Sequence, residues 1–295
     1  MSYTVVTDTS ANLPTKLLKK LNVSVLPFTY HYDDQAFNCL DTDSFDGDEF
    51  YDRIRAGLVV TTSQITPYHY EELFRPILAR GEDMLFVGMS SGISGSFHSS
   101  CIAAEAMREE FPERKIELVD TRAASLGEGI IVLKAAEMRV AGVPIEAAAE
   151  KLRTLSARMC QIFTVDDLMY LRRGGRLSNL SAIVGTVLNI KPLLKGNDLG
   201  QIVSFAKLRG RKKSIEAIAE RYDKLVHKAH EQIVGIAQAG CRKDAEYLVS
   251  LLNKNHPPKE ILNVEYEPVT GSHVGPGALA LFFIGPEEGA REAIV

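Results

Sequence analysis

The chain has 295 residues, of which 45% are hydrophobic and 24% charged, and its 34 basic and 38 acidic side chains give a net charge of −4. At about 150 residues per domain, this length predicts roughly two domains, which are large enough to fold without disulfides or metals. The composition excludes a disordered chain, and the longest apolar run, 278–284, is too short to span a membrane. The near balance of charge argues against general nucleic-acid binding.

Short apolar runs alternate with longer amphipathic stretches in the first half of the chain. Predicted strands lie at 3–6, 23–29, 84–89 and 116–119, and predicted helices lie at 14–20, 45–56, 68–80, 95–110, 129–140 and 145–157. This alternation predicts parallel βαβ units and an open sheet with helices on both faces.

The second half has fewer strands, and long helices separate them. Predicted helices lie at 166–171, 181–188, 213–229 and 243–253, and predicted strands at 202–205, 233–237, 261–266 and 278–284. This pattern indicates a smaller mixed sheet. We therefore predict an α/β protein with a mostly parallel, Rossmann-like N-terminal domain at 1–160 and a smaller mixed α/β domain at 161–295.

The cysteines and histidines match no disulfide or metal-binding pattern. The cysteines lie far apart without a CxxC spacing, at Cys39, Cys101, Cys160 and Cys241. Such a distribution is typical of reduced thiols rather than of a disulfide framework. The seven histidines include no His-Glu-x-x-His motif, so no metal is expected. No basic and apolar leader opens the chain, and we expect a cytoplasmic protein.

Small polar residues follow several of the predicted strands. Asp8-Thr9-Ser10, the segment 90–96 and Asp120-Thr121 stand at strand ends, and the segment 61–67 precedes a helix. Open parallel sheets bind ligands at the carboxyl ends of their strands, and hydroxyls at helix N-termini suit an anion. Each loop alone is equally well explained as a helix cap. Two Ser/Gly loops that face one crevice would make an anion site.

The motifs narrow the kind of anion. The Ser-rich loop lacks the lysine of a P-loop, and no Gly-x-Gly-x-x-Gly follows the first strand. The segment 92–96 also departs from a Gly-x-Ser-x-Gly nucleophile elbow, because Ser96 occupies the last position. A carboxylate held by neutral hydroxyl groups is therefore a plausible ligand.

Positive charge gathers in the second half. Three arginines surround a glycine pair in the segment 171–178, and five cations crowd a predicted strand-to-helix junction: Lys207, Arg209, Arg211, Lys212 and Lys213. A charge run is usually a solvated face, but in an acidic chain it also suits a phosphate or an acidic partner. His273 lies in a Gly-rich loop, 271–277, that permits close backbone approach, so it is the histidine we expect in a site.

These segments resemble the DegV family in order and spacing along nearly the whole chain. In the first half the similar segments are VVTDTSANLP, TTSQITP, SSGISGSFHSS and VDTRAASLGEG, and in the second half they are DLMYLRRGGRLS, IKPLLKGNDLGQI, KLRGRKKS and GSHVGPGALALFF. The family's usual Thr-Ser-Gln-Pro-Ser-Pro reads Thr-Ser-Gln-Ile-Thr-Pro here, and its Leu-Ser-Gly-Thr reads Ile-Ser-Gly-Ser. Both changes leave the hydroxyl groups in place.

The resemblance implies a two-domain α/β protein that holds one long-chain fatty acid between its domains, with no other cofactor. Carried over by motif, the residues that bind the carboxylate are Thr62, Ser94 and His273, and the supporting head-group loop comprises Ser63, Gly95 and Ser96. Apolar residues of 129–140 and 181–194 are candidates for the wall of the tail pocket, although core packing explains them equally well.

The resemblance further implies a bacterial carrier without catalytic residues, which presents its fatty acid to a fatty acid kinase for acyl-phosphate formation. Membrane contact would at most be transient. Arg176 and Arg209, with Arg173, would face the kinase or its phosphate. Two other hypotheses stay open. One is a serine-dependent lipid hydrolase with Ser94 as nucleophile and His273 as base. The other is a regulatory module that docks a partner through its basic stretches.

Overall fold

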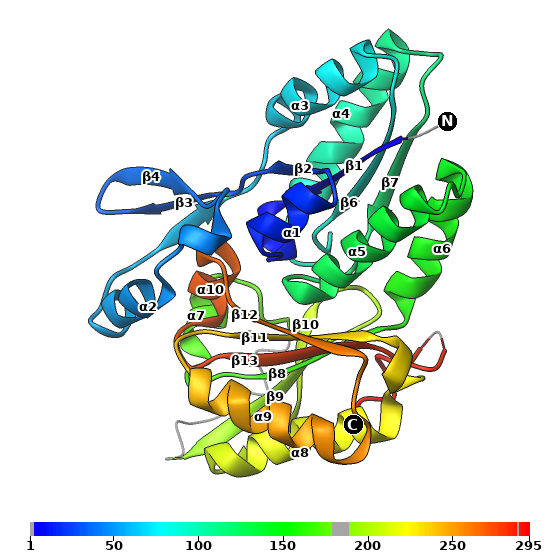
Figure 1. Cartoon of the computed structure of the whole chain (residues 1–295). Coiled ribbons are helices and arrows are strands. Elements are labelled where there is room, and N and C mark those ends of the chain that lie inside the picture. The colour runs from blue at the N-terminus through cyan, green and yellow to red at the C-terminus, as the bar shows by residue number, and fades with distance from the viewer. Residues whose placement is uncertain (1–2, 179–188, 288) are drawn as a thin grey trace.

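A computed structural model describes residues 3–178, 189–287 and 289–295 of the chain. In its first half, a parallel sheet has the strand order β2-β1-β6-β7 (Figure 1), formed by β1 (Tyr3–Asp8), β2 (Val23–Leu26), β6 (Asp83–Gly88) and β7 (Ile116–Asp120). Every residue of β1 and β6 is buried, as expected for parallel strands that are covered on both faces. The strand order reverses at β1. Ligands of open sheets bind at such a switch point, beyond the carboxyl ends of the strands.

Helices cover both faces of this parallel sheet. On one face lie α3 (Pro67–Ala79) and α4 (Ser96–Glu110), and on the other lie α5 (Leu126–Val140) and α6 (Ile145–Ala157). Helix α5 also contacts strands of the second sheet, so it lies between the two sheets (Figure 1). Its apolar residues are buried around most of its circumference, which is the pattern of a helix enclosed by protein.

The second sheet is mixed and has the order β10-β9-β8-β13-β11-β12. It comprises β8 (Met159–Thr164), β9 (Ile190–Gly196), β10 (Ile202–Arg209), β11 (Ile233–Gln238), β12 (Glu260–Glu265) and β13 (Leu279–Ile284). Helices α8 (Arg211–Leu225) and α9 (Arg242–Asn255) cover its outer face (Figure 1). Alternate residues of β13 face opposite ways: Phe282 joins the core shared with the first half, and Phe283 joins the core beneath α8 and α9.

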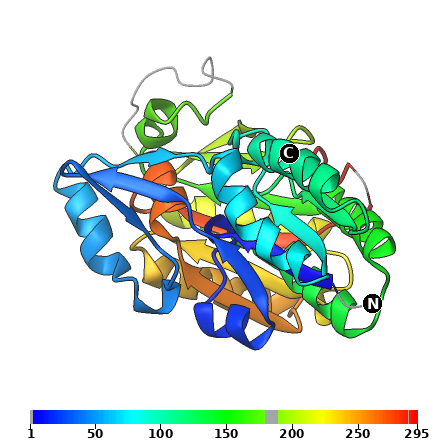
Figure 2. The same cartoon turned by 90° about the horizontal axis from the view of Figure 1, so that it is seen from above.

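A small antiparallel sheet and a helix form an arm that projects from the body (Figure 1). The arm consists of β3 (Thr29–Tyr32), β4 (Gln35–Asn38), β5 (Thr61–Ser63) and α2 (Gly47–Arg55), with the strand order β4-β3-β5. Stacked rings of Tyr32 and Phe37, with centroids 4.4 Å apart, stabilise its hairpin. Short elements complete the described chain: η1 (Thr9–Ala11), α1 (Thr15–Lys20), η2 (Thr42–Ser44), α7 (Met169–Arg173), η4 (Ala229–Glu231) and α10 (Pro268–Val274). Seen from above, the first sheet and its helices overlie the second sheet (Figure 2).

The predicted α/β class with a parallel N-terminal sheet is confirmed, whereas three details of the prediction are wrong. The second sheet is not the smaller one, because it contains six strands against four in the parallel sheet. Strands β8 and β9 had not been predicted. The predicted strand at 23–29 ends at Leu26, because Pro27 has no N–H to continue the ladder, and Thr29 starts β3 of the arm. The helix predicted at 181–188 lies outside the described residues.

Candidate functional site

A cavity of about 830 Å³, measured with its mouth, lies between the loops of the first sheet and the inner face of the second. The apolar part of its lining includes Phe28, Met89, Ile93, Phe163, Leu171, Ile202, Tyr266, Val269, Val274 and Phe282. The polar part includes Thr62, Ser63, Gln64, Ser94, Arg176 and His273. The cavity therefore suits a ligand with a long apolar body and a polar group.

Thr62 and His273 form a polar pair in this lining. Thr62 is the central residue of β5 and lies opposite Tyr30 of β3, while His273 belongs to α10. Thr62 Oγ1 and His273 Nε2 are 2.8 Å apart. Burial lowers the pKa of His273 to about 4, and the positive charge of Arg176 adds to the effect. The imidazole is therefore neutral at pH 7, and the pair offers one uncharged hydrogen-bond donor, because the other of its two polar hydrogens lies in the bond between Thr62 and His273.

His273 lies on a helix and not in the Gly-rich loop that the sequence predicted. The carboxylate of Glu267 caps α10 by accepting two hydrogen bonds of 2.6 Å from backbone N–H groups of the first turn. The helix ends at Gly275, whose φ of 78° is a conformation that favours glycine. The backbone N–H of Glu267 donates to Asn12 Oδ1 at 3.0 Å, so the helix that carries His273 is tied to the first half of the chain.

Ser94 lies in the loop between β6 and α4 and lines the same cavity. Its Oγ donates to Ser96 Oγ at 3.0 Å, and Ser96 Oγ accepts the backbone N–H of Ile65 at 3.1 Å. These bonds join the Ser94 loop to the segment that follows β5. A Cβ on Gly95 would lie 2.3 Å from Gln64 Oε1, so a larger residue there would displace the end of the Gln64 side chain. Ser63 also lines the cavity, and its hydroxyl is 2.8 Å from His31 Nε2.

Arg176 stands between the cavity and an outer hollow of about 870 Å³. The two spaces share Arg176, Thr62 and His273 in their linings. The guanidinium donates through Nε to the carbonyl of Ile93 at 3.2 Å and through Nη1 to the carbonyl of Gly174. Within the described residues no carboxylate pairs with Arg176, so its positive charge can act on an anion at either side.

Arg173 lies farther out, on the wall of the hollow. Its side chain is exposed, and its guanidinium carbon lies 4.8 Å from the centroid of the Tyr170 ring, a cation–π arrangement. The same wall contains Val59, which is 64% exposed, and other apolar residues at the end of α2. The hollow thus combines positive charge with an apolar surface beside the Thr62–His273 pair.

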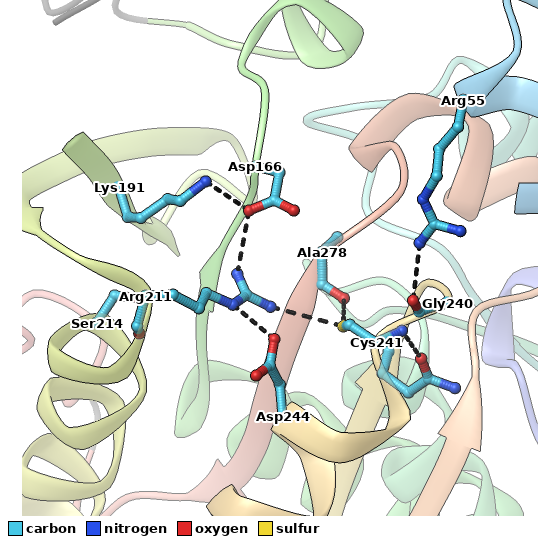
Figure 3. A network of polar contacts seen from close by, with 10 residues as sticks. Arg55, Asp166, Lys191, Arg211, Ser214, Gly240, Cys241, Asp244 and Ala278 are labelled. Carbon is cyan, nitrogen blue, oxygen red and sulfur yellow. Dashed lines mark hydrogen bonds and ion pairs between the residues drawn. The ribbon is translucent and has the colours of Figure 1, made fainter. Parts of the chain in front are cut away.

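Arg209 and Arg211 have different surroundings, although they are only two residues apart. Arg211 reaches inward, where its Nε donates to Asp244 Oδ2 at 2.8 Å and its Nη1 is 3.9 Å from Asp166 Oδ1 (Figure 3). Asp166 Oδ1 also accepts from Lys191 Nζ at 2.6 Å. Arg209 is exposed at the end of β10 and lines neither the cavity nor the hollow. The exposed cations of this stretch are Lys207, Arg209, Lys212 and Lys213.

Two buried carboxyl groups lie behind the Ser94 loop. Ser10 Oγ is 2.5 Å from both Asp8 Oδ1 and Glu128 Oε2. A hydroxyl has only one hydrogen to donate, so one of the two carboxyls must hold a proton. Burial raises the pKa of Asp8 to about 6 and raises that of Glu128 well above its usual value. Asp8 Oδ2 also accepts the backbone N–H of Met89 at 3.3 Å, which fixes the start of the loop that leads to Ser94.

The apolar wall comes from residues that the sequence did not indicate. The segment 129–140 does not line the cavity, because it forms the interior of α5 and packs against both sheets. Of the segment 181–194, residues 181–188 lie outside the described residues, and the remainder is absent from the described lining. Instead the wall includes Gln161 and Phe163 of the unpredicted strand β8, and the loop 123–125 before α5. These contacts depend on how the two sheets pack, and no local sequence pattern predicts that packing.

Two further observations concern the described part of the chain. No group of three or more His, Cys, Asp or Glu side chains there is placed to hold a metal ion. None of its helices is both long and apolar enough to cross a membrane.

Comparison with known proteins gives a consistent family match. The model of a protein family described as "Uncharacterised protein, DegV family" matches residues 2–285. A DegV domain-containing protein of Clostridium perfringens is 36% identical over 287 residues, which cover 96% of this chain and 97% of that protein.

Solved structures agree with this match. A DegV family protein from Thermus thermophilus, described as fatty acid binding, has a TM-score of 0.87 at 30% identity and covers 97% of this chain and 100% of its own. A DegV family protein from Ruminococcus gnavus, solved with vaccenic acid, has a TM-score of 0.86 at 25% identity, with coverage of 96% of this chain and 99% of its own.

Proposed function

The chain belongs to the DegV family, and on that premise we propose that it binds one long-chain fatty acid in the cavity between its two sheets. The observation that carries the proposal is the Thr62–His273 pair, a neutral polar pair in the wall of a cavity whose lining also has a large apolar part. The fatty acid binding described for the Thermus thermophilus relative supports the same ligand class. One cavity of this kind suits one acyl chain.

The acyl chain would supply most of the affinity. Each CH₂ group removed from water contributes about 0.8 kcal/mol, so a long chain far outweighs a few hydrogen bonds. The carboxylate would accept hydrogen bonds from Thr62, Ser94 and His273, which fix the orientation of the ligand. Ser63, Gly95 and Ser96 would shape the loop around it. The charge of Arg176 favours an anion at this end of the cavity.

The finer proposal is that the protein is a non-catalytic carrier in the bacterial cytoplasm, with at most transient membrane contact. Two domains, 1–160 and 161–295, would enclose the ligand and present its carboxylate to a fatty acid kinase for acyl-phosphate formation. The outer hollow supports this role, because Arg173 and Arg176 place positive charge beside the head-group pair. Arg209 would contact the kinase outside the hollow.

The hydrogen bonding of the site favours binding over hydrolysis. A serine hydrolase needs its histidine base in contact with the nucleophile, but Ser94 Oγ donates to Ser96, and His273 Nε2 is bonded to Thr62. Burial also lowers the pKa of His273 to about 4, which makes it a weak base at neutral pH. A module that only docks a partner would have no use for an apolar cavity of this size.

Thermal unfolding of delipidated protein tests the proposal. Palmitic acid at about 100 times its dissociation constant should stabilise the fold by about 2.7 kcal/mol, which is roughly 5 °C in Tm. Methyl palmitate is the matched control, because it has the same chain but no carboxylate, and it should give a smaller gain. No gain from palmitic acid, or an equal gain from the ester, would contradict the proposed carboxylate site.

A further inference from the structure

Arg291 is a fully buried arginine in the C-terminal segment, beyond residue 285, where the family match ends. Its guanidinium donates only to main-chain carbonyl groups: Thr121 at 3.1 Å, Arg122 at 2.7 Å, Asn197 at 3.3 Å, and Ser156. Among the described residues no carboxylate pairs with it. Burial lowers the pKa of Arg291 to about 10, so it stays charged at neutral pH. Burial of a cation costs free energy, so the groups that hold Arg291 in place indicate what it stabilises.

Two of the carbonyls that Arg291 binds, those of Arg122 and Asn197, belong to two neighbouring segments of the cavity wall, one from each half of the chain. Arg122 belongs to the loop 121–125, which lines the cavity from the first half of the chain. Arg122 and Ser125 have φ values of 49° and 53°, a conformation that non-glycine residues rarely adopt without support. Asn197 begins the turn 197–200 between β9 and β10, and Gly200 of this turn lines the cavity from the second half. One guanidinium therefore links these two segments, and it adds to their direct contact, in which Arg122 Nη1 donates to the carbonyl of Asp198 at 2.8 Å.

Further hydrogen bonds carry this link to the cavity surface. The carbonyl of Arg122 also accepts from Gln161 Nε2 at 3.1 Å, and Gln161 Oε1 accepts the backbone N–H of Ala124 at 3.1 Å. Gln161 and Ala124 both line the cavity. Ser90 Oγ of the first half donates to the carbonyl of Gly200 at 2.8 Å. A shift of Arg122 or of the turn would therefore change the shape of the lining.

The segment that contains Arg291 is itself anchored to the second sheet. Lys195 of β9 is buried, and its Nζ donates to the carbonyls of Arg291 at 3.0 Å and Glu292 at 3.3 Å. Glu292 Oε1 accepts the backbone N–H of Asp198 in the turn 197–200 at 3.2 Å. The backbone around Arg291 is thus held in place, and its side chain spans a defined distance.

We propose that Arg291 is a positioning residue of the ligand cavity, which fixes the spacing between the loop 121–125 and the turn 197–200 and so controls how long a bound acyl chain is retained. This inference rests on the proposed fatty acid binding and adds a residue outside the matched family segment. Loss of the guanidinium removes a donor from all four carbonyls, of which those of Arg122 and Asn197 keep a second donor in Gln161 Nε2 and the Gly200 N–H, and it loosens the junction between the loop and the turn. Chain lengths that the native spacing excludes would then be accepted.

Two variants and one matched control test this role. Arg291→Met keeps the volume and removes every donor, and Arg291→Lys keeps the charge but replaces the planar fork with a single donor atom. Arg158→Met is the control: Arg158 donates twice to the carbonyl of Gly285 near the same end of the chain, but neither bond reaches a cavity-lining residue. The measurements are the dissociation rate of 12-(9-anthroyloxy)stearic acid, the chain lengths of acids extracted from purified protein, and Tm.

We expect Arg291→Met to release the probe at least tenfold faster than wild type and to carry a broader range of chain lengths. The release rate and the chain-length range of Arg291→Lys should lie between those of wild type and those of Arg291→Met. Arg158→Met should lower Tm without changing the release rate or the chain-length range. Wild-type rates and chain lengths in both Arg291 variants, or in the lysine variant if the methionine variant does not fold, would overturn the proposal. The measurement on wild-type protein tests the proposed function separately, because wild-type protein that binds no probe contradicts fatty acid binding itself.

Discussion

Thr62 and His273, which are 211 positions apart in the chain, are joined by a contact of 2.8 Å between Oγ1 and Nε2. Thr62 comes from the projecting arm of the first half, and His273 comes from a helix of the second half. The bond from Glu267 to Asn12 anchors that helix to the first half at 3.0 Å. The Thr62–His273 contact therefore forms only when both halves are folded and packed together.

The hydroxyl groups of Thr62 and Ser94 should each contribute to ligand retention. Thr62→Val and Ser94→Ala each remove one hydrogen bond to a charged group, which is worth about 1.5–3 kcal/mol and corresponds to a roughly 10- to 150-fold weaker Kd. Titration of delipidated protein with palmitic acid measures this change. Ser63→Ala is the neighbouring control and should lose less, because that hydroxyl is bonded to His31. Unchanged Kd values in both Thr62→Val and Ser94→Ala would refute the head-group assignment.

Acid should destabilise the protein through His273. Its pKa is about 4 in the folded state and about 6.5 in the unfolded state, so the unfolded chain binds more protons between these values. The contribution of His273 to the free energy of unfolding should therefore fall by about 3 kcal/mol as the pH drops from 6.5 to 4. Denaturant unfolding across this pH range measures this contribution as the difference in the free energy of unfolding between wild type and His273→Asn.

This comparison isolates His273 from the buried acids. Asp8 and Glu267 have raised pKa values of about 6 and about 7, so their contributions have the opposite pH dependence, but they are present in both proteins. A difference between wild type and His273→Asn that does not vary with pH would show that His273 titrates normally.

The stability of Glu128→Gln, relative to that of wild type, should increase as the pH rises. Burial raises the pKa of Glu128, so the folded state retains a proton that the unfolded state loses above its ordinary pKa, and wild-type stability falls with rising pH. Glutamine is neutral at every pH and removes this dependence. The difference in unfolding free energy should change by about 1.4 kcal/mol per pH unit at most, measured by urea unfolding at pH 5 and pH 8. Glu137→Gln, an exposed position on the same helix, should show no such trend.

Arg209 should affect delivery of the fatty acid and not its binding. Arg209→Ala removes an exposed cation that lines neither the cavity nor the hollow, so palmitic acid should bind with wild-type affinity. Acyl-phosphate formation with a fatty acid kinase should slow severalfold, because a charge at the proposed contact is lost. Lys224→Ala removes another exposed cation of the second half and serves as the control. Equal phosphorylation rates for the two variants would count against a docking role for Arg209.

The sequence pointed to polar residues that the structure places in the lining of the cavity, but it did not point to the apolar walls. The Ser94 motif is a run of small polar residues at a predicted strand end, where open parallel sheets bind ligands, and the Thr62 motif is a similar run before a predicted helix. The pairing of Thr62 with His273 follows from no local pattern. The resemblance brought these residues together, and the structure gives their distance.

The missed elements have physical causes. Strand β9 contains Lys191 and Pro192, which lower strand propensity, yet it pairs on both sides within the second sheet. Helix α10 contains Gly271 and is only seven residues long, and its stability depends on the cap from Glu267. Nothing in the sequence indicated that Arg291 is buried, because a single arginine near a chain end is ordinarily exposed. Its burial depends on carbonyl groups from three distant segments.

The central claim is that one fatty acid occupies the cavity, and the content of the purified protein tests it most directly. Mass spectrometry of a solvent extract, quantified against protein concentration, should find close to one long-chain fatty acid per chain in wild type and clearly less in Thr62→Val. Wild-type protein that yields no fatty acid, and that takes up none when palmitic acid is added, would contradict the account.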